Sequence, residues 1–283
     1  MKKLIFILSA VLFFFSCTHQ KKTATIAASP FPPDTLALHF WDKSDFKKVD
    51  LINHNEAIES MFMEYLQTLN QANQSTRKTS IDIVLDKIIN DNPALLGYFV
   101  SLFDKYLYNP NSPIRNEELY MFVLQYLSQS PAVDETNKMR YSSRLAMLSK
   151  NRVGEIATDF EYILRNGKKN KLSNIEAEYI IIFFNNPDCH DCARVKNILS
   201  STSYPGVKIL AIYPDKDLSV WEKTVYPESW INGYNNETIS QLYDLKAIPT
   251  LYLLDRNKRI ILKDAPVEEI IRYCVNTKNN YYF

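Results

Sequence analysis

Residues 179–184 (YIIIFF) form a continuous apolar run, and two cysteines follow it closely, at positions 189 and 192. A continuous apolar run of this length is typical of a strand that is buried on both faces. A Pro-Asp turn follows at 187–188, and the spacing of apolar residues over 189–199 predicts a helix. Cys189 and Cys192 are therefore expected at the N-terminal end of a helix that directly follows a buried strand.

The rest of the C-terminal half indicates a small mixed sheet. Its apolar runs are short, and a turn with the sequence Asp-Arg-Asn-Lys separates the last two of them. The predicted elements are strands at 179–184 and 207–213, a hairpin of strands at 250–254 and 259–262, and helices at 189–199 and 266–275. This order predicts an α/β domain over residues 151–283, with a central mixed sheet flanked by helices.

Residues 36–150 show helical periodicity instead. Apolar residues recur there at spacings of three and four, in the segments 55–69, 81–89, 95–107, 117–127 and 138–148. The pattern predicts an all-α domain that precedes the α/β domain. Its aromatic residues Phe40, Trp41 and Phe46 are interpreted as a hydrophobic plug between helices rather than as a ligand site.

The first residues of the chain predict export. A short basic segment precedes an apolar stretch that ends at Ser16 and Cys17. The stretch is shorter than the roughly 20 residues that a membrane-spanning helix needs, so residues 1–16 are predicted to be a signal peptide. A small residue directly before a cysteine resembles a bacterial lipobox, which would make Cys17 the acylated N-terminus and residues 17–35 a lipid-anchored linker. A cysteine that merely follows an ordinary cleavage site is the alternative.

The charge balance and the glycine and histidine content argue against several classes of function. Lys and Arg total 33 against 32 Asp and Glu, and loss of residues 1–16 removes two lysines and no acid, which leaves 31 against 32 and a net charge of −1. Such a balance gives no electrostatic footprint for nucleic acid. The five glycines form no phosphate-binding loop, and the four histidines are too scattered to suggest a histidine metal centre. We therefore expect no nucleic acid partner and no resident metal.

The motif Cys189-His190-Asp191-Cys192 carries the candidate chemistry. Two thiols at this spacing can form a disulfide within one helical turn, and the positive end of the helix favours a thiolate on Cys189. Cys189 is the expected attacking thiolate. Cys192, which lies one turn further along and is expected to be more buried, would attack the resulting mixed disulfide. Protonated His190 would stabilise the thiolate and Asp188 and Asp191 would oppose it, so these three are candidates for redox tuning of undecided sign.

Two other interpretations of the cysteine pair remain open. A structural zinc site would need two further ligands, but His190 lies between the two thiols, and Cys274 is interpreted as a small buried hydrophobic residue. A structural disulfide in an oxidising compartment is the other alternative.

Three motifs together resemble a known family. Residues 154–160 (GEIATDF) are similar to the Gly-x-x-Ala-Pro-Asp-Phe entry of membrane-tethered TlpA/ResA-type thioredoxin-like proteins, with Thr158 in place of the usual Pro. The cysteine pair and the segment Ile248-Pro249-Thr250 resemble the thioredoxin active-site pair and its cis-proline loop. The resemblance covers residues 153–283. It implies a thioredoxin-like fold in which Ile248 and Pro249 lie beside the disulfide and pair with an extended substrate segment.

The chain also departs from that pattern. Asp188 stands where family members commonly have Trp, and Phe183 stands where an Asp or Asn often assists the buried thiol. These differences bear on potential and rate rather than on the thiol chemistry. In the N-terminal half, residues 39–46 resemble the opening of a helical domain of unknown function found before thioredoxin-like domains in exported lipoproteins.

The residues and the resemblance together predict an exported thiol:disulfide oxidoreductase that reduces client disulfides through the Cys189–Cys192 couple. We expect no cofactor beyond that redox-active disulfide. The expected partners are disulfide-containing exported client proteins, a membrane electron donor, and the membrane itself through lipid on Cys17. The protein would face the periplasm from the cell envelope, at either the inner or the outer membrane. The alternative function is a lipoprotein binding or scaffold module in which Cys189 and Cys192 form a static disulfide.

Overall fold

The computed structural model describes residues 31–201 and 204–279, and one compact unit begins at Pro33. The predicted signal peptide, Cys17 and the linker residues up to 30 lie outside the described residues. Along the described part of the chain, no helix combines the length and the apolar character that crossing a membrane requires.

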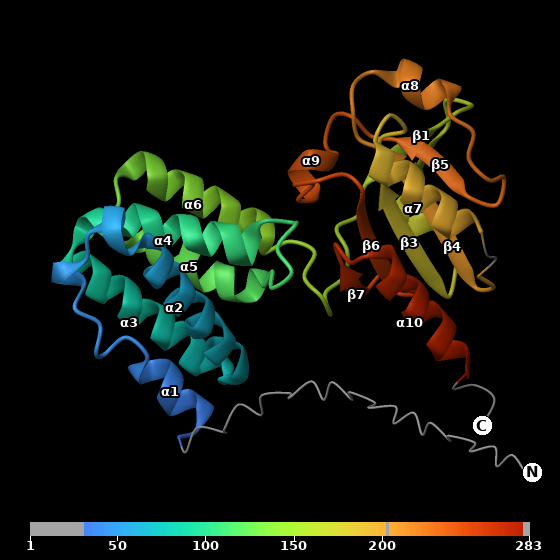
Figure 1. Cartoon of the computed structure of the whole chain (residues 1–283). Coiled ribbons are helices and arrows are strands. Elements are labelled where there is room, and N and C mark those ends of the chain that lie inside the picture. Colours follow the sequence, from blue (N-terminus) through green and yellow to red (C-terminus); the bar gives the residue numbers. More distant parts are fainter. Residues whose placement is uncertain (1–30, 202–203, 280–283) are drawn as a thin grey trace, which may run out of the picture. The chain divides into compact units, whose positions relative to one another are not determined.

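Residues 33–148 fold into helices (Figure 1). They are α1 (Pro33–His39), α2 (Leu51–Gln71), α3 (Gln74–Asp91), α4 (Leu96–Phe103), α5 (Glu117–Gln129) and α6 (Glu135–Leu148), with short 3₁₀ or π segments η1 (Phe46–Lys48), η2 (Pro93–Leu95) and η3 (Asp104–Tyr108). Helices α3, α5 and α6 are each preceded by an N-cap residue, Asn73, Asn116 and Asp134 respectively. Each of these side chains accepts a hydrogen bond from the backbone N–H three residues later. These caps satisfy N–H groups that have no partner inside a helix.

The core of this helical region is rich in aromatic rings. Trp41 and Phe46 are buried and both pack against Phe99. Trp41 also packs edge-on against Tyr65, and Phe40 contacts the same two rings. The interpretation of these aromatic residues as a plug between helices is confirmed.

The rest of the described chain forms a seven-stranded mixed sheet with flanking helices. Its elements are β1 (Glu161–Leu164), β2 (Lys169–Lys171), η4 (Leu172–Asn174), β3 (Tyr179–Phe184), α7 (His190–Ser200), β4 (Val207–Tyr213), α8 (Leu218–Lys223), β5 (Ile231–Tyr234), α9 (Ile239–Leu242), β6 (Thr250–Asp255), β7 (Ile260–Lys263) and α10 (Val267–Asn279). The strand order is β2-β1-β5-β4-β3-β6-β7. β4 runs parallel to β3 and β5, whereas the other neighbouring pairs are antiparallel. The predicted fold class, a helical region followed by a mixed sheet flanked by helices, is confirmed.

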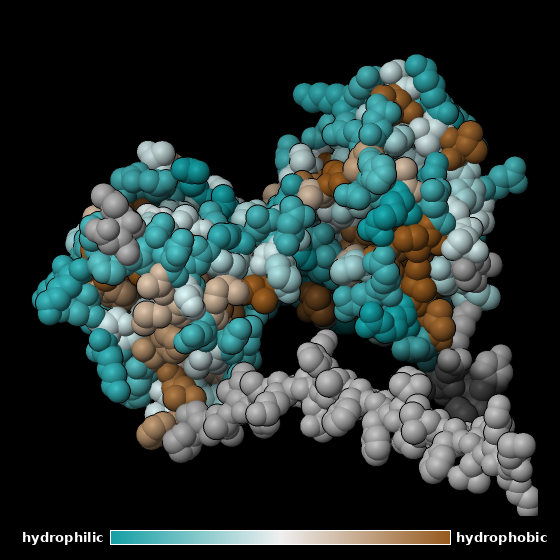
Figure 2. Space-filling model, viewed as in Figure 1, coloured by the Kyte–Doolittle hydropathy of each residue, from teal (hydrophilic) through white to brown (hydrophobic). Residues whose placement is uncertain are grey.

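Strand β3 contributes to two hydrophobic cores, because successive residues of a strand point to opposite faces. Ile181 and Phe183 pack with α7 and α10, while Ile180, Ile182 and Phe184 pack with residues that include Ile239 of α9. Both faces of β3 are therefore covered, which explains why its sequence is apolar throughout. On the face shown in Figure 2, hydrophilic side chains form most of the surface, with smaller apolar patches between them.

Several elements were not predicted from the sequence. β2 contains no apolar residue and β5 has only four residues, so neither shows a recognisable strand pattern. Gly233 in β5 is required by close packing, since an added Cβ would lie 2.8 Å from Tyr162 and 3.1 Å from the Ile163 carbonyl oxygen. α1 begins at Pro33, ahead of the predicted start at residue 36, because the fixed φ of proline suits the first position of a helix.

Candidate active site

The register of the sheet brings the two predicted parts of the site together. Phe184, the last residue of β3, pairs with Thr250, the first residue of the antiparallel strand β6. The residues that follow Phe184 and those that precede Thr250 therefore emerge at the same edge of the sheet. The first segment leads to Cys189, and the second is the Ile248–Pro249 loop, whose peptide bond is cis.

Cys189 is the N-cap residue of α7, and its sulfur lies between the helix and the loop. The Sγ atom accepts a hydrogen bond from the Cys192 N–H at 3.4 Å and donates one to the Ile248 carbonyl oxygen, also at 3.4 Å. The side chain is half-buried. The hydrogen bond from the Cys192 N–H satisfies one of the donors that have no partner inside the first turn of the helix.

Cys192 lies within the core beneath Cys189. Only 2% of the residue is exposed, and it packs with Phe183 and Val195. Burial raises the pKa of the Cys192 thiol, although the Asn186 N–H, 3.4 Å from its Sγ atom, acts in the opposite direction. The two thiols therefore differ in access, and the second is kept protonated by its surroundings.

The turn between β3 and α7 is shaped by Asn185 and Asn186, which are not among the site residues predicted from the sequence. The Asn186 side chain accepts a hydrogen bond from the Asp188 N–H and donates one to Asp215, while its backbone oxygen accepts from the Cys189 N–H. Asn185 is buried, and its amide donates to the Phe183 carbonyl at 3.0 Å. The Asn-Asn-Pro order was the available signal, since Asn side chains often bond to backbone groups in turns.

Tyr226 completes a small polar pocket beside Cys192. Its hydroxyl donates a 2.6 Å hydrogen bond to the Asn185 side chain, and the Lys196 ammonium lies 5.4 Å from the centre of its ring. The pocket has a volume of about 320 Å³ and is also lined by Cys192 and Asp188. Burial, followed by the nearby Cys192, raises the pKa of Tyr226, so the hydroxyl keeps its proton and acts as a donor.

The three candidate tuning residues lie at the surface. The His190 side chain is 97% exposed and the Asp191 side chain 69% exposed, and their closest approach to each other is 3.9 Å. Asp188 is also exposed, at the rim of the pocket next to Cys192. Solvent weakens the electrostatic effect of charges this exposed. Their assignment to redox tuning stays a prediction.

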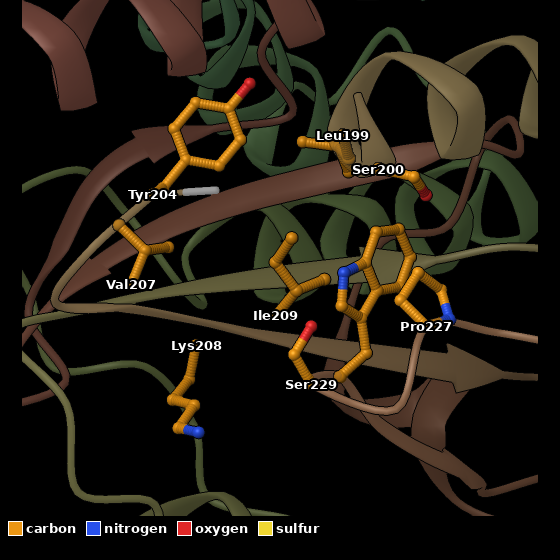
Figure 3. A pocket seen from close by; sticks show the side chains of 9 residues that line it. Leu199, Ser200, Tyr204, Val207, Lys208, Ile209, Pro227 and Ser229 are labelled. Atoms are coloured by element: carbon orange, nitrogen blue, oxygen red, sulfur yellow. The ribbon is translucent and has the colours of Figure 1, made fainter. Parts of the chain in front are cut away.

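Cys274 belongs to α10 and to the same hydrophobic core as Cys192. Cys274 is buried in the core between the sheet and α10, as its interpretation as a small hydrophobic residue predicted. A pocket of about 210 Å³ is lined by Leu199, Ile209 and Pro227 among others (Figure 3). It adjoins the C-terminal end of α7, about 15 Å along the helix from the cysteines.

Among the residues that the structure describes, no group of three His, Cys, Asp or Glu side chains is placed to hold a metal ion.

The difference between the thiols predicts an order of modification. Mild alkylation of the reduced protein at neutral pH should label Cys189 before Cys192, because Cys192 is buried and its pKa is raised. Cys274 should react as slowly as Cys192, since it is also buried. Peptide mass mapping at successive times measures the order, and earlier labelling of Cys192 would reverse the assigned roles.

The chain is similar to known proteins in both its helical region and its sheet region. Residues 34–151 match the model of a family described as a domain of unknown function, DUF5106. No curated protein matches the chain. A crystal structure of a thioredoxin-like protein from Bacteroides caccae is similar over 90% of this chain and 99% of that one, with 38% sequence identity and a TM-score of 0.80.

Two further solved structures match only the C-terminal part. The C-terminal domain of an uncharacterised protein from Bacteroides fragilis is 41% identical, over 44% of this chain and 98% of that one, with a TM-score of 0.42. The thioredoxin domain of a thiol-disulfide oxidoreductase from Bacteroides vulgatus is 16% identical, over 44% of this chain and 98% of that one, with a TM-score of 0.34.

Proposed function

The chain belongs to the thioredoxin-like proteins, and we propose that it exchanges thiols and disulfides through Cys189 and Cys192. The observation that carries this proposal is the unequal placement of the two sulfurs. Cys189 Sγ lies at the N-terminus of α7 beside the Ile248 carbonyl, whereas Cys192 is buried one turn further along. An accessible first thiol and a buried second thiol suit an intermolecular attack followed by an intramolecular one.

The proposed reaction has two displacement steps. The Cys189 thiolate attacks one sulfur of a client disulfide, so that a mixed disulfide forms and the other client sulfur leaves as a thiolate. Cys192 then loses its proton and attacks Cys189 Sγ, which closes the Cys189–Cys192 disulfide and releases the second client thiolate. The two client thiolates take up two protons, equal in number to those lost by the cysteines. Two electrons have then passed from the protein to the client.

Ile248 and Pro249 are proposed as the substrate-binding residues. The Ile248 carbonyl oxygen is already within hydrogen-bonding distance of Cys189 Sγ. An extended client segment could therefore bond to this backbone while its disulfide reaches the thiolate. Pro249 has no N–H of its own to offer, so the pairing would involve the backbone of Ile248.

For the direction of the reaction, we propose reduction of client disulfides. The TlpA/ResA resemblance favours a protein that a membrane dithiol donor keeps reduced, and disulfide-containing exported proteins would be its clients. In this proposal the acidic residues Asp188 and Asp191 would act against a thiolate at the pair, whereas a stabilised thiolate is what makes a strong oxidant. The redox group is the cysteine pair itself, without a further cofactor.

The reduction potential of the Cys189–Cys192 couple tests both function and direction. Equilibration with glutathione or dithiothreitol buffers should give a value between those of a structural bridge and a dedicated oxidant, with rapid exchange. A value below about −300 mV with inert thiols would support a static disulfide in a binding module instead. A value near about −120 mV, with fast oxidation of a dithiol peptide, would contradict the reducing direction and leave only the site assignment.

We also propose that the protein is a lipoprotein of the cell envelope that faces the periplasm. Residues 1–16 would be the signal peptide, Cys17 the lipid-bearing residue, 17–35 the linker, 36–150 the helical domain and 151–283 the thioredoxin-like domain. The sequence order of a basic start, an apolar stretch and a small residue before Cys17 supports this assignment.

Replacing Cys17 with Ser should prevent anchoring. The variant should either remain an unprocessed precursor or appear as soluble mature protein, since position 17 no longer has a thiol to carry the lipid. Membrane fractionation together with labelling by a fatty-acid analogue measures the outcome. A variant that still partitions with the membrane and keeps its acyl label would show that another residue is modified.

A further inference from the structure

A groove of about 560 Å³ adjoins the candidate active site on the side of the Ile248–Pro249 loop. Its lining comes from the first turns of α7 and α10, from the loop before β6, and from residues 110–115 of the helical region. The groove begins beside the attacking thiol, because Ile248 lines it and accepts the hydrogen bond from Cys189. The helical region thus contributes directly to the surroundings of the site.

The loop that the helical region contributes, residues 109–116, is held in shape by its own hydrogen bonds. The Ser112 hydroxyl donates to the Tyr106 carbonyl at 2.6 Å, and the Asn116 N–H donates to the Leu107 carbonyl at 3.0 Å. The Asn111 N–H donates to the Asn109 side chain at 2.9 Å. Two prolines further restrict the backbone. A wall that is already ordered costs little conformational entropy when it binds a partner.

Partly buried ion pairs attach this loop and the residue after it to segments around the site. Arg115 forms a pair with the Asp264 carboxylate and also donates to the Asp264 carbonyl at 2.8 Å. Glu117, just after the loop, pairs with Lys263 at 2.8 Å and with Lys246. Lys246 directly precedes the Ala247–Ile248–Pro249 segment, so the attachment lies next to the groove.

We propose that the 109–116 loop is a wall of the client-binding site, and that the groove receives an extended polypeptide segment flanking the client disulfide. This inference rests on the proposed function and gives the helical region a part in it. A groove of this volume holds several side chains rather than two sulfur atoms. Its lining combines apolar residues such as Val195 and Leu251 with charges of both signs, Arg194 and Glu269, as in peptide-binding surfaces.

The proposal separates two kinds of substrate. A small disulfide needs only the Cys189 sulfur, whereas a protein disulfide brings chain on either side of its cysteine and must fit the groove. Filling the groove from the helical region should therefore slow reduction of protein disulfides alone. Asn111 is suited to this test because it lines the groove and its side chain is exposed.

The test compares Asn111→Trp with Asn257→Trp in the full mature chain. Asn257 is a matched control: it is also an exposed turn residue whose N–H donates to the side chain two positions earlier, here Asp255. It lies at the far end of β6 from the groove, about 20 Å away. The readouts are the kcat/KM for insulin disulfides, the rate with a small aromatic disulfide, and the potential of the cysteine pair.

Asn111→Trp should lower kcat/KM for insulin about tenfold, equivalent to about 1.4 kcal/mol. It should leave the rate with the small disulfide and the potential unchanged. Asn257→Trp should change none of the three. An unchanged insulin rate in Asn111→Trp would overturn the proposal, as would an equal loss with both substrates.

Glu269→Trp provides a second test from the opposite wall of the groove, should Asn111→Trp fail to fold. Glu269 is exposed in the first turn of α10 and lines the groove. Its replacement should produce the same selective loss with insulin. Failure of the proposed function would give a different result, because the wild-type protein would then reduce neither substrate. That result would also contradict the client-binding site proposed here.

Discussion

Replacing Cys192 with Ser should convert the protein from a catalyst into a trap for its client. Cys189 keeps its place at the N-terminus of α7, so the mixed disulfide still forms, but no second thiol remains to resolve it. Turnover of insulin disulfides should fall to the rate measured without protein. Non-reducing electrophoresis should show a covalent adduct between protein and client, and a strong reductant should cleave it.

Two controls assign the roles of the individual thiols. Cys189→Ser should abolish both turnover and adduct, because it removes the attacking sulfur. Cys274→Ala should keep turnover, since Cys274 is a buried residue of α10 and has no part in the proposed two-thiol exchange. A Cys192→Ser variant that still turns over at the wild-type rate would disprove the two-thiol mechanism. An adduct that persists in Cys189→Ser would move the attacking role to another cysteine.

Replacing Glu117 with Gln should lower the free energy of unfolding by about 3 kcal/mol, the largest stability effect that we expect from one charge. The Glu117 carboxylate pairs with Lys246 and Lys263, whose side chains are only 7% and 10% exposed. Glutamine keeps the size of the side chain but removes a counter-charge from two largely buried ammonium groups, of which Lys246 keeps its pair with Asp244 at 3.4 Å. Denaturant unfolding of the mature chain measures the difference.

Glu118 offers a matched control for that measurement. It is the next residue of α5, also lies in the first turn, and also forms an ion pair, with Arg152. Its side chain is 48% exposed, so Glu118→Gln should cost less than about 1 kcal/mol. Equal losses in the two variants would show that the helix terminus, rather than the buried pairs, is the source of the effect.

The stability difference between wild type and Glu117→Gln should depend on pH. Burial alone would raise the pKa of Glu117, but Lys263 and Lys246 more than offset this and place it below its usual value of 4.5. A carboxyl group whose pKa is lowered by folding stabilises the protein above its unfolded pKa and loses that effect as pH falls through the folded pKa. The difference should therefore be constant above pH 4.5 and shrink at lower pH. A difference that stays the same in acid would contradict the ionic explanation.

Much of the sheet region could be predicted because its signals are local. β3 is apolar along its whole length, and the β6–β7 hairpin has turn residues at its tip. The helical spacing of α7, together with the preceding turn, predicted that the cysteines would lie at the start of a helix. Each of these signals is contained within a few consecutive residues, where backbone geometry alone sets the periodicity.

The short strands and the polar surroundings of the two thiols could not be predicted from local sequence patterns. β5 lies inside the sheet because β1 and β4 pair with it, and not because its four residues favour a strand. The Tyr226 hydroxyl donates a hydrogen bond to the Asn185 side chain, although the two residues are 41 positions apart in the sequence. No local pattern indicates these contacts, because they depend on which strands become neighbours and in which register.

Local sequence patterns were enough to predict the position of Cys189 and Cys192 at a helix terminus and the succession of a helical region and a mixed sheet. The surroundings of the two cysteines depend on tertiary packing. The pairing of Phe184 with Thr250 brings the Ile248 carbonyl to the Cys189 sulfur, and Arg115 meets Asp264 across 149 residues of sequence. The periodicity of apolar residues indicates which face of a helix or strand is buried. Contacts between residues far apart in sequence depend instead on how the elements pack against one another.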